Sequence, residues 1–221
     1  MKTAALIPCR KGSKGIPNKN FRELCKYPLW YWSYQEAWKS KIFDLIIISS
    51  DGGITNGKVL EPALIDNERP EKFATDEATL DDLLYHYWLK NKDIELWCLL
   101  QPTSPLRNAS DIRKAHRMAI KVKYDSVVSV IPDPMMYWVK NATSQGHLAT
   151  YHIHKRPNRQ QRKSFFRETG AIYFVKSYVL EMLGLRIGGT IGLCTIPKLR
   201  AIEIDDMDDW KIAELLLDGK K

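Results

Sequence analysis

The sequence has no long apolar run and few residues of the kind that build crosslinks or metal sites. Its longest apolar stretches, such as residues 97–100, are far shorter than the roughly 20 residues of a membrane-spanning helix, so we expect no membrane partner. The 4 cysteines are scattered and form no Cys-x-x-Cys pair, a pattern typical of reduced thiols. Internal repeats and low-complexity tracts are also absent, and the composition excludes fibrous and disordered classes.

What remains is the profile of an ordinary globular protein, with 44% apolar, 27% charged and 10% aromatic residues. The length of 221 residues predicts one domain, residues 1–221, that buries about 70% of the surface of the unfolded chain. The N-terminus has one lysine, a short apolar stretch and then basic residues, unlike the long apolar centre of a signal peptide. We therefore expect a cytoplasmic protein.

The net charge of +8 is concentrated in two basic islands. Residues 10–26 carry a net charge of +5 and residues 155–167 carry +6, so the rest of the chain is acidic, at −3. Two islands on an acidic chain indicate local anion sites, whereas a nucleic-acid-binding protein would spread its basic residues as a stripe. The aromatic residues lie mainly in expected helices and are not interleaved with the basic ones as stacking platforms. A solubilising surface and a non-enzymatic polyanion binder stay as alternatives, and we expect no nucleic-acid partner.

Short apolar runs rich in β-branched residues alternate with longer amphipathic stretches. The short runs predict strands over residues 3–8, 45–49, 95–101, 126–131, 170–175, 192–196 and 201–204. The amphipathic stretches predict helices over residues 29–39, 79–90, 110–121, 177–183 and 208–217. Alternation of this kind predicts an α/β fold with a doubly wound, mostly parallel sheet. Between residues 133 and 167 the alternation fails, and this polar, basic segment is interpreted as an insertion.

The first expected strand leads into a basic loop that contains glycine, residues 8–20. The loop after the first strand of a parallel α/β sheet is where ligands are expected. Gly12, Ser13 and Gly15 would let backbone amides approach a phosphate chain. The basic side chains that would neutralise a triphosphate are Arg10, Lys14 and Lys19. The loop contains neither GxxxxGK[ST] nor GxGxxG, and an exposed basic turn stays as the alternative.

The loop sequence from Ile7 to Asn20 resembles the opening motif of the acylneuraminate cytidylyltransferases, also called CMP-sialic acid synthetases. Further motifs of that family follow in the same order. They are Ser49-Ser50-Asp51-Gly52-Gly53, Arg69-Pro70-Glu71 with Ala74-Thr75-Asp76, Leu99 to Arg107, Arg159-Gln160-Gln161, Arg167 with Gly170-Ala171-Ile172-Tyr173, and Ile202-Glu203-Ile204-Asp205. The motif over residues 99–107 is a specific signature of the family, and the series covers nearly the whole chain.

The resemblance implies a Rossmann-like nucleotidyltransferase sheet whose inserted segment, residues 133–167, forms a homodimer interface. It also implies an enzyme that joins CTP to an acidic nine-carbon sugar, a nonulosonic acid of the sialic or legionaminic type, with Mg²⁺ as cofactor. The anomeric hydroxyl of the sugar would attack the α-phosphorus of CTP in line, and pyrophosphate would leave. The alternative among enzymes is a cytidylyltransferase for another keto-sugar acid. The sequence identifies no general base.

The resemblance assigns roles to individual residues. Arg10, Lys14 and Lys19 would hold the triphosphate and stabilise charge on the transferred group. Asn20 and Arg69 would face the cytidine. The residues that would line the side of the sugar and its carboxylate are Gln101, Arg159, Arg167 and Tyr173. Arginine suits bidentate capture of a carboxylate, and the alternative for the two arginines of this set is a solvated basic surface.

Glu203 and Asp205 lie two residues apart in the last expected strand, so their side chains should point to one face. Mg²⁺ prefers a few carboxylates together with phosphate oxygens and water, so this pair could hold the ion that bridges CTP. The family pattern at these positions is Asp-x-Asp, from which Glu203 departs. The alternative is that the acidic run, which continues to Asp209, only starts the final helix.

Two further departures from the family pattern lie near the expected substrate site. Lys11 stands where many relatives have an uncharged residue, and Glu168-Thr169-Gly170 replaces the commoner x-Asn-Gly. The wording of the opening motif is similar to that of bacterial enzymes that use legionaminic or related di-N-acyl sugars. The resemblance therefore favours that subgroup over enzymes that use sialic acid itself.

Overall fold

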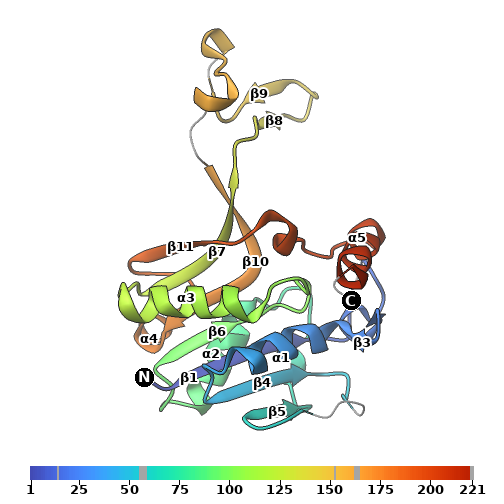
Figure 1. Cartoon of the computed structure of the whole chain (residues 1–221), viewed down its shortest axis with the longest axis vertical. Coiled ribbons are helices and arrows are strands. Elements are labelled where there is room, and N and C mark those ends of the chain that lie inside the picture. Colours follow the sequence, from blue (N-terminus) through green and yellow to red (C-terminus); the bar gives the residue numbers. More distant parts are fainter. Residues whose placement is uncertain (14, 55–58, 152, 162–164, 220–221) are drawn as a thin grey trace.

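The computed structural model describes residues 1–13, 15–54, 59–151, 153–161 and 165–219, and Figure 1 shows their arrangement. At the centre lies a seven-stranded sheet with the strand order β11-β7-β10-β6-β1-β4-β5. Its strands are β1 (Thr3–Cys9), β4 (Leu45–Ser50), β5 (Ala63–Asp66), β6 (Leu96–Leu99), β7 (Ser126–Asp133), β10 (Phe165–Lys176) and β11 (Ile191–Thr195). β10 runs antiparallel to β6 and β7, and the other neighbouring strands are parallel. The predicted α/β fold with a mostly parallel sheet is confirmed.

Helices cover both faces of this sheet (Figure 1). They are α1 (Leu29–Ser40), α2 (Leu80–Lys90), α3 (Ala109–Lys121), α4 (Ser177–Leu183) and α5 (Met207–Asp218). Side chains cap three of them: the Thr79 hydroxyl accepts from the Asp82 backbone, and Asn108 and Asp206 each build a capping box. Within the described part of the chain, every helix is too short or too polar to cross a membrane.

The sheet separates two buried apolar layers because successive residues of a strand face opposite sides. In β1, which is buried along its whole length, Ala5 and Ile7 join the layer of α1 and α3. Ala4 and Leu6 join the layer of α2 and α4. The first strand is therefore held rigidly from both faces, and so is the point at which the basic loop leaves it.

A third apolar cluster ties the basic loop to the C-terminal part of the chain. Ile16, only 1% exposed, packs with Ile204 and with Trp210 of α5. The short hairpin of β2 (Glu23–Leu24) and β3 (Tyr27–Pro28) contributes Leu24 to the same cluster. The loop after β1 is thus anchored by a buried side chain in its middle.

An arm projects from the body of the protein between β7 and β10 (Figure 1). It contains the hairpin of β8 (Trp138–Lys140) and β9 (Gly146–Leu148) and two 3-10 turns, η3 (Ile153–Lys155) and η4 (Arg159–Gln161). The arm covers most of the segment interpreted as an insertion, residues 133–167, and β10 begins inside that segment at Phe165. Its side chains include the exposed Met135, Trp138 and Val139.

The predicted strands and helices are found in the structure with one exception. Residues 201–204 do not form a strand, because η5 (Lys198–Ala201) ends there and a loop follows. The backbone N–H of Ile204 donates to the carbonyl oxygen of Thr103 at 2.8 Å, so this alternating run bonds a loop instead of a sheet edge. The alternation that should have directed Glu203 and Asp205 to one face therefore does not apply. The sequence also missed β5, whose apolar run is too short to predict a strand.

Candidate functional site

A cleft of about 370 Å³ lies at the carboxyl ends of β1 and β6. The described residues that line it are Pro8, Arg10, Ser13, Gly15, Lys19, Asn20, Arg69, Asp76, Ala78, Leu80, Gln101, Pro102, Thr103 and Asp205. The chain runs from β1 to β4 and β5 on one side, and it then crosses to β6 on the other side of β1. The cleft therefore lies where the strand order reverses, which is the usual ligand site of an open α/β sheet.

Arg10, in the loop after β1, is tied to the segment that precedes α2. Its Nη1 donates to the carbonyl oxygen of Thr75 at 2.9 Å and lies 2.9 Å from Oδ1 of Asp76. The side chain is 33% exposed, and a guanidinium has five N–H donors, so Arg10 retains donors for an anion in the cleft. The pairing of Arg10 with Asp76 joins two walls of the cleft.

Lys19 begins the 3-10 turn η1 (Lys19–Phe21), and its side chain is only 13% exposed. Its Nζ donates to the carbonyl oxygen of Ile204 at 2.6 Å and lies 3.6 Å from Oδ1 of Asp205. The basic loop approaches this segment so closely that a Cβ on Gly15 would lie 2.5 Å from the Asp205 carbonyl oxygen. The structure shows that the missing side chain of Gly15 permits the close approach of Asp205, and its predicted approach to phosphate stays a prediction.

Two buried polar side chains, Asn20 and Arg69, line the inner part of the cleft. Nδ2 of Asn20 donates to the Arg10 carbonyl oxygen at 2.9 Å. Nη2 of Arg69 donates to the Phe73 carbonyl oxygen, whereas its buried Nε and Nη1 have no hydrogen-bond partner among the described residues. Burial lowers the pKa of Arg69, and the Asp51 carboxylate opposes that shift. Buried N–H groups without an acceptor are costly, so this position favours a ligand that supplies acceptor atoms.

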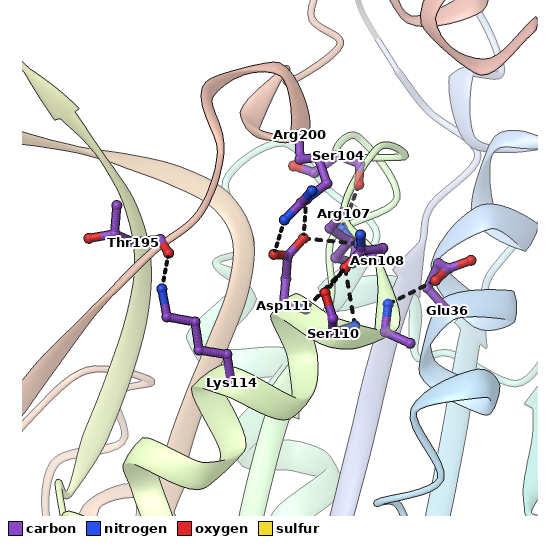
Figure 2. A network of polar contacts seen from close by, with 10 residues as sticks. Glu36, Ser104, Arg107, Asn108, Ser110, Asp111, Lys114, Thr195 and Arg200 are labelled. Atoms are coloured by element: carbon purple, nitrogen blue, oxygen red, sulfur yellow. Dashed lines mark hydrogen bonds and ion pairs between the residues drawn. The ribbon is translucent and has the colours of Figure 1, made fainter. Parts of the chain in front are cut away.

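The loop after β6 presents Gln101 and Thr103 to the cleft, and a buried arginine fixes its shape. Nη1 of Arg107 donates to the carbonyl oxygens of Gln101 and Ser104 at 2.7 and 2.8 Å, and Nη2 donates to the Ser33 hydroxyl. Figure 2 shows Arg107 beside Ser104 at the start of α3. Burial lowers the pKa of Arg107 to about 10, so the guanidinium stays charged at neutral pH. Its charge-assisted hydrogen bonds make this loop a rigid wall.

The two acidic residues of the expected metal pair occupy different environments. The Asp205 side chain is 77% exposed and lines the cleft. Glu203 accepts from the Thr103 hydroxyl at 3.3 Å, and burial raises its pKa, to which the Asp205 carboxylate adds. No cluster of three or more His, Cys, Asp or Glu side chains that could hold a metal occurs in the described ranges. Asp206 caps α5, so the helix-start alternative applies to that residue and leaves Asp205 to the cleft.

The structure gathers a large part of the predicted site in one cleft. The predicted residues that line it are Arg10, Ser13, Lys19, Asn20, Arg69, Gln101 and Asp205. Lys14 lies outside the described residues. Gly12 is exposed and Glu203 is half-buried, and neither is among the residues that line the cleft.

The predicted sugar-side residues other than Gln101 belong to β10 and to the arm. Tyr173 is 3% exposed on β10, and its hydroxyl donates to Oε1 of Glu168 at 2.5 Å. Burial raises the pKa of Tyr173, with the Glu168 hydrogen bond adding to the shift. Nε of Arg167 lies 3.9 Å from Oδ2 of Asp133, at the base of the arm. Arg159 belongs to η4 of the arm. Tyr173 and Arg167 are not among the residues that line the cleft described here.

Sequence reasoning missed cleft residues whose role depends on the fold. Asp76 belongs to a quoted motif, but its ion pair with Arg10 joins positions 65 or more residues apart and has no local signal. Thr103 lies in the specific signature, and its hydroxyl donates to Glu203, 100 positions away in the chain. Arg107 ends that signature, and its burial marks it as an organiser of the loop rather than a ligand-binding residue.

Three cations and two carboxylates are found among the described residues that line the cleft. Two of the cations have a carboxylate within 4 Å, and these partners are Asp76 for Arg10 and Asp205 for Lys19. The oxygens of a ligand rich in phosphate can replace these carboxylates as partners of the two cations. The arrangement suits chemistry in which bound anions are positioned and developing charge is stabilised.

Comparison with known proteins gives a consistent result. A family model described as cytidylyltransferase matches residues 4–205. The chain is 29% identical over 215 residues to N-acylneuraminate cytidylyltransferase A of Danio rerio, a match that covers 96% of this chain and 50% of that protein. It is 30% identical over 226 residues to the CMP-N,N'-diacetyllegionaminic acid synthase of Legionella pneumophila, covering 99% and 97%. The chain thus spans half the length of the fish relative and nearly all of the bacterial one.

A solved structure has the same fold. It is described as CMP:2-keto-3-deoxy-manno-octonic acid synthetase complexed with CTP, and it matches this chain with a TM-score of 0.70. The match covers 100% of both chains at 16% sequence identity. At this level of identity the likeness supports the fold alone, which agrees with the doubly wound sheet described above.

Proposed function

The chain belongs to the cytidylyltransferase family, and on that premise we propose that it transfers the cytidylyl group of CTP to a nonulosonic acid and releases pyrophosphate. The observation that carries this proposal is the cleft at the switch point of the sheet, lined by Arg10, Lys19 and Arg69. The names of the fish and bacterial relatives supply the substrate class.

The triphosphate of CTP would bind to the basic loop. Arg10 and Lys19 each hold a carboxylate or carbonyl partner that a phosphate oxygen can replace. Lys14, in the same loop, is proposed as a third phosphate ligand on the basis of the family motif. Asn20 and Arg69 would face the cytidine, and the two buried Arg69 nitrogens without partners support this role because a pyrimidine base and a ribose offer acceptor atoms.

In the proposed reaction, the anomeric hydroxyl oxygen of the sugar forms a bond to the α-phosphorus of CTP as the bond to the β-phosphate oxygen breaks. The proton of the hydroxyl passes to solvent water, and the leaving pyrophosphate takes the electron pair of the bond that breaks. Arg10 and Lys19 would hold the phosphates in line with the hydroxyl and stabilise the charge that develops on the leaving group. The rigid Arg107 loop would keep Gln101 fixed relative to the phosphates.

The sugar would approach from the side of Gln101, whose amide can both donate and accept hydrogen bonds. Arg167 at the base of the arm and Arg159 in η4 are proposed to bind the carboxylate, and Tyr173 to border the sugar. This proposal requires that the arm and its base form part of the substrate site. We favour a legionaminic-type acid, since the match to the Legionella pneumophila protein covers 97% of its length.

Mg²⁺ is proposed as the cofactor, and Asp205 fits it. The exposed Asp205 carboxylate faces a cleft suited to phosphate, and Mg²⁺ is commonly held by one or two carboxylates together with substrate phosphates. Glu203 is proposed as a second ligand, although its carboxylate already accepts from Thr103. The ion would neutralise charge on the phosphate chain when bound.

The arm is proposed to form a homodimer interface. Met135, Trp138 and Val139 are 62%, 58% and 59% exposed, and apolar and aromatic side chains of this kind are typical anchors of interfaces. A two-fold dimer is the usual arrangement of a homo-oligomer. Because the proposed co-substrate is CTP, we also propose that the protein acts in the cytoplasm.

The decisive experiment measures pyrophosphate release with each nucleoside triphosphate against a panel of nonulosonic acids and shorter keto-sugar acids, in the presence of Mg²⁺. We expect release with CTP and a legionaminic- or sialic-type acid. Release only with a shorter keto-sugar acid would establish the alternative enzyme. If no sugar supports release and oligonucleotide binding weakens steeply between low and moderate salt, the protein is a polyanion binder and the proposal is wrong.

A further inference from the structure

A bidentate ion pair outside the cleft joins α3 to η5. Nε and Nη2 of Arg200 donate to Oδ2 and Oδ1 of Asp111 at 2.8 and 2.9 Å, as Figure 2 shows. The Asp111 side chain is 4% exposed, and it also closes the capping box with Asn108 at the start of α3. A buried carboxylate is costly unless it is paired, so this ion pair holds η5 firmly against α3.

Arg200 is followed almost directly by residues 202–205, of which Asp205 lines the cleft. The backbone of Ile204 connects this segment to two other parts of the chain that line the cleft. Its N–H donates to the Thr103 carbonyl oxygen at 2.8 Å, and its carbonyl oxygen accepts from Lys19 at 2.6 Å. The position of one backbone unit thus decides where the Lys19 ammonium lies.

Residues 202–205 have little room to shift towards their neighbours. A Cβ on Gly15 would lie 2.5 Å from the Asp205 carbonyl oxygen, and one on Gly170 would lie 2.7 Å from Oε1 of Glu203. The far end of the segment is fixed by Asp206, which caps α5. The near end is fixed by η5, and the Arg200 pair with Asp111 is the charged contact that holds η5 to the body.

We propose that Arg200 and Asp111 are positioning residues, which set the place of residues 202–205 and through them the places of Lys19 and Asp205. Neither residue lines the cleft, so neither acts on a substrate directly. The inference rests on the proposed function only for its catalytic consequence. Its structural part is that Lys19 is held by residues 202–205, and that this segment is anchored to α3 through Arg200 and Asp111.

The structural part is tested without any substrate. The Lys19 side chain is only 13% exposed and its ammonium is bonded to Ile204, so its rate of acetylation by an amine-reactive ester, measured by mass spectrometry, reports whether residues 202–205 are in place. In Arg200→Gln we expect this rate to rise about tenfold, together with faster hydrogen exchange of the Ile204 amide. Arg200→Lys keeps the charge but not the two-bond geometry, and it should recover part of the protection.

A matched control separates this effect from a general loss of stability. Nζ of Lys176 lies 3.1 Å from Oδ1 of Asp125, and Lys176 pairs with Leu96 at the amino end of β6, away from the cleft. Lys176→Gln should lower the melting temperature about as much as Arg200→Gln does, while the acetylation rate of Lys19 stays at the wild-type value. Asp111→Asn gives a second test from the other partner. If it does not fold, Arg200→Gln still decides, since that side chain is 30% exposed.

The catalytic consequence is measured separately. Arg200→Gln should raise the KM for CTP and the Mg²⁺ concentration for half-maximal rate by about tenfold each, more than it changes the KM for the sugar. Unchanged Lys19 acetylation and Ile204 exchange in a folded Arg200→Gln protein would overturn the inference. Absence of pyrophosphate release by the wild-type protein would instead overturn the proposed function, and the acetylation result would still judge the positioning role.

Discussion

The Lys19 ammonium lies 2.6 Å from the carbonyl oxygen of Ile204, although the two residues are 185 positions apart in the chain. This contact closes the basic loop against the segment that carries Asp205. It means that the end of the cleft proposed to bind phosphate is assembled from segments far apart in the sequence. The same contact makes Lys19 the residue on which the proposed chemistry can be tested most directly.

Lys19→Ala should lower the rate of pyrophosphate release by about 100-fold or more, because the ammonium is proposed to stabilise charge on the leaving phosphates. The fold should stay intact because the buried Ile16 also anchors this loop. Lys26→Ala is the matched control, since Lys26 belongs to the same basic island but is exposed and does not line the cleft. Wild-type turnover in the Lys19 variant would remove it from the site.

Asp205→Asn should lower turnover sharply and raise the Mg²⁺ concentration that the enzyme needs. The amide keeps the shape of the side chain and removes the charge that is proposed to hold the ion. Asp208→Asn is a suitable control because that side chain is 85% exposed in the first turn of α5 and pairs with Lys211. A magnesium titration decides the matter, and an unchanged profile for the Asp205 variant would leave the acidic run as a helix start only.

Replacing two apolar residues of the arm should convert the proposed dimer to monomers. Sedimentation of the wild-type protein at micromolar concentration is expected to give twice the chain mass of 25.6 kDa, and Met135→Asp with Trp138→Asp is expected to give a single chain mass. Met182→Asp, 76% exposed on α4, controls for adding a charge to an exposed apolar position. A wild-type protein found only at 25.6 kDa contradicts the dimer.

The strands and helices could be predicted from the sequence because their periodicity is local. The buried residues of β1 and the caps Thr79 and Asn108 each leave a pattern within a few positions. Residues 201–204 show the limit of this reasoning. Their alternation is typical of a strand, yet the partner of Ile204 is the Thr103 loop, and only the tertiary structure selects it.

The candidate site could be predicted in part for a topological reason. Arg10, Arg69 and Gln101 each come shortly after a strand, namely β1, β5 and β6. Parallel strands bring their carboxyl ends to one edge of the sheet, so these residues meet there. The pairing of Arg10 with Asp76 could not be predicted, because it depends on how two loops meet across that edge. The same applies to Arg200, whose partner lies 89 positions away on a different helix.

A last prediction concerns pH and stability. The His116 ring packs against Phe174, with 5.7 Å between ring centroids, and burial lowers its pKa. His86 has a lowered pKa for the same main cause. Because the folded-state pKa lies below the unfolded value of about 6.5, the unfolded chain takes up protons first as the pH falls. The free energy of unfolding should therefore decrease as the pH drops below about 6.5, and the decrease should end once the pH lies below the folded-state pKa values.

Urea unfolding between pH 7.5 and pH 5 measures this dependence. The His116→Gln variant should show a smaller loss of stability over this range than the wild-type protein, because one group that binds protons more tightly in the unfolded state has been removed. His147→Gln is the control, since that side chain is exposed on β9 and packs in neither core layer. Equal slopes for His116→Gln and the wild type would mean that burial of this histidine does not contribute to the acid sensitivity of the fold.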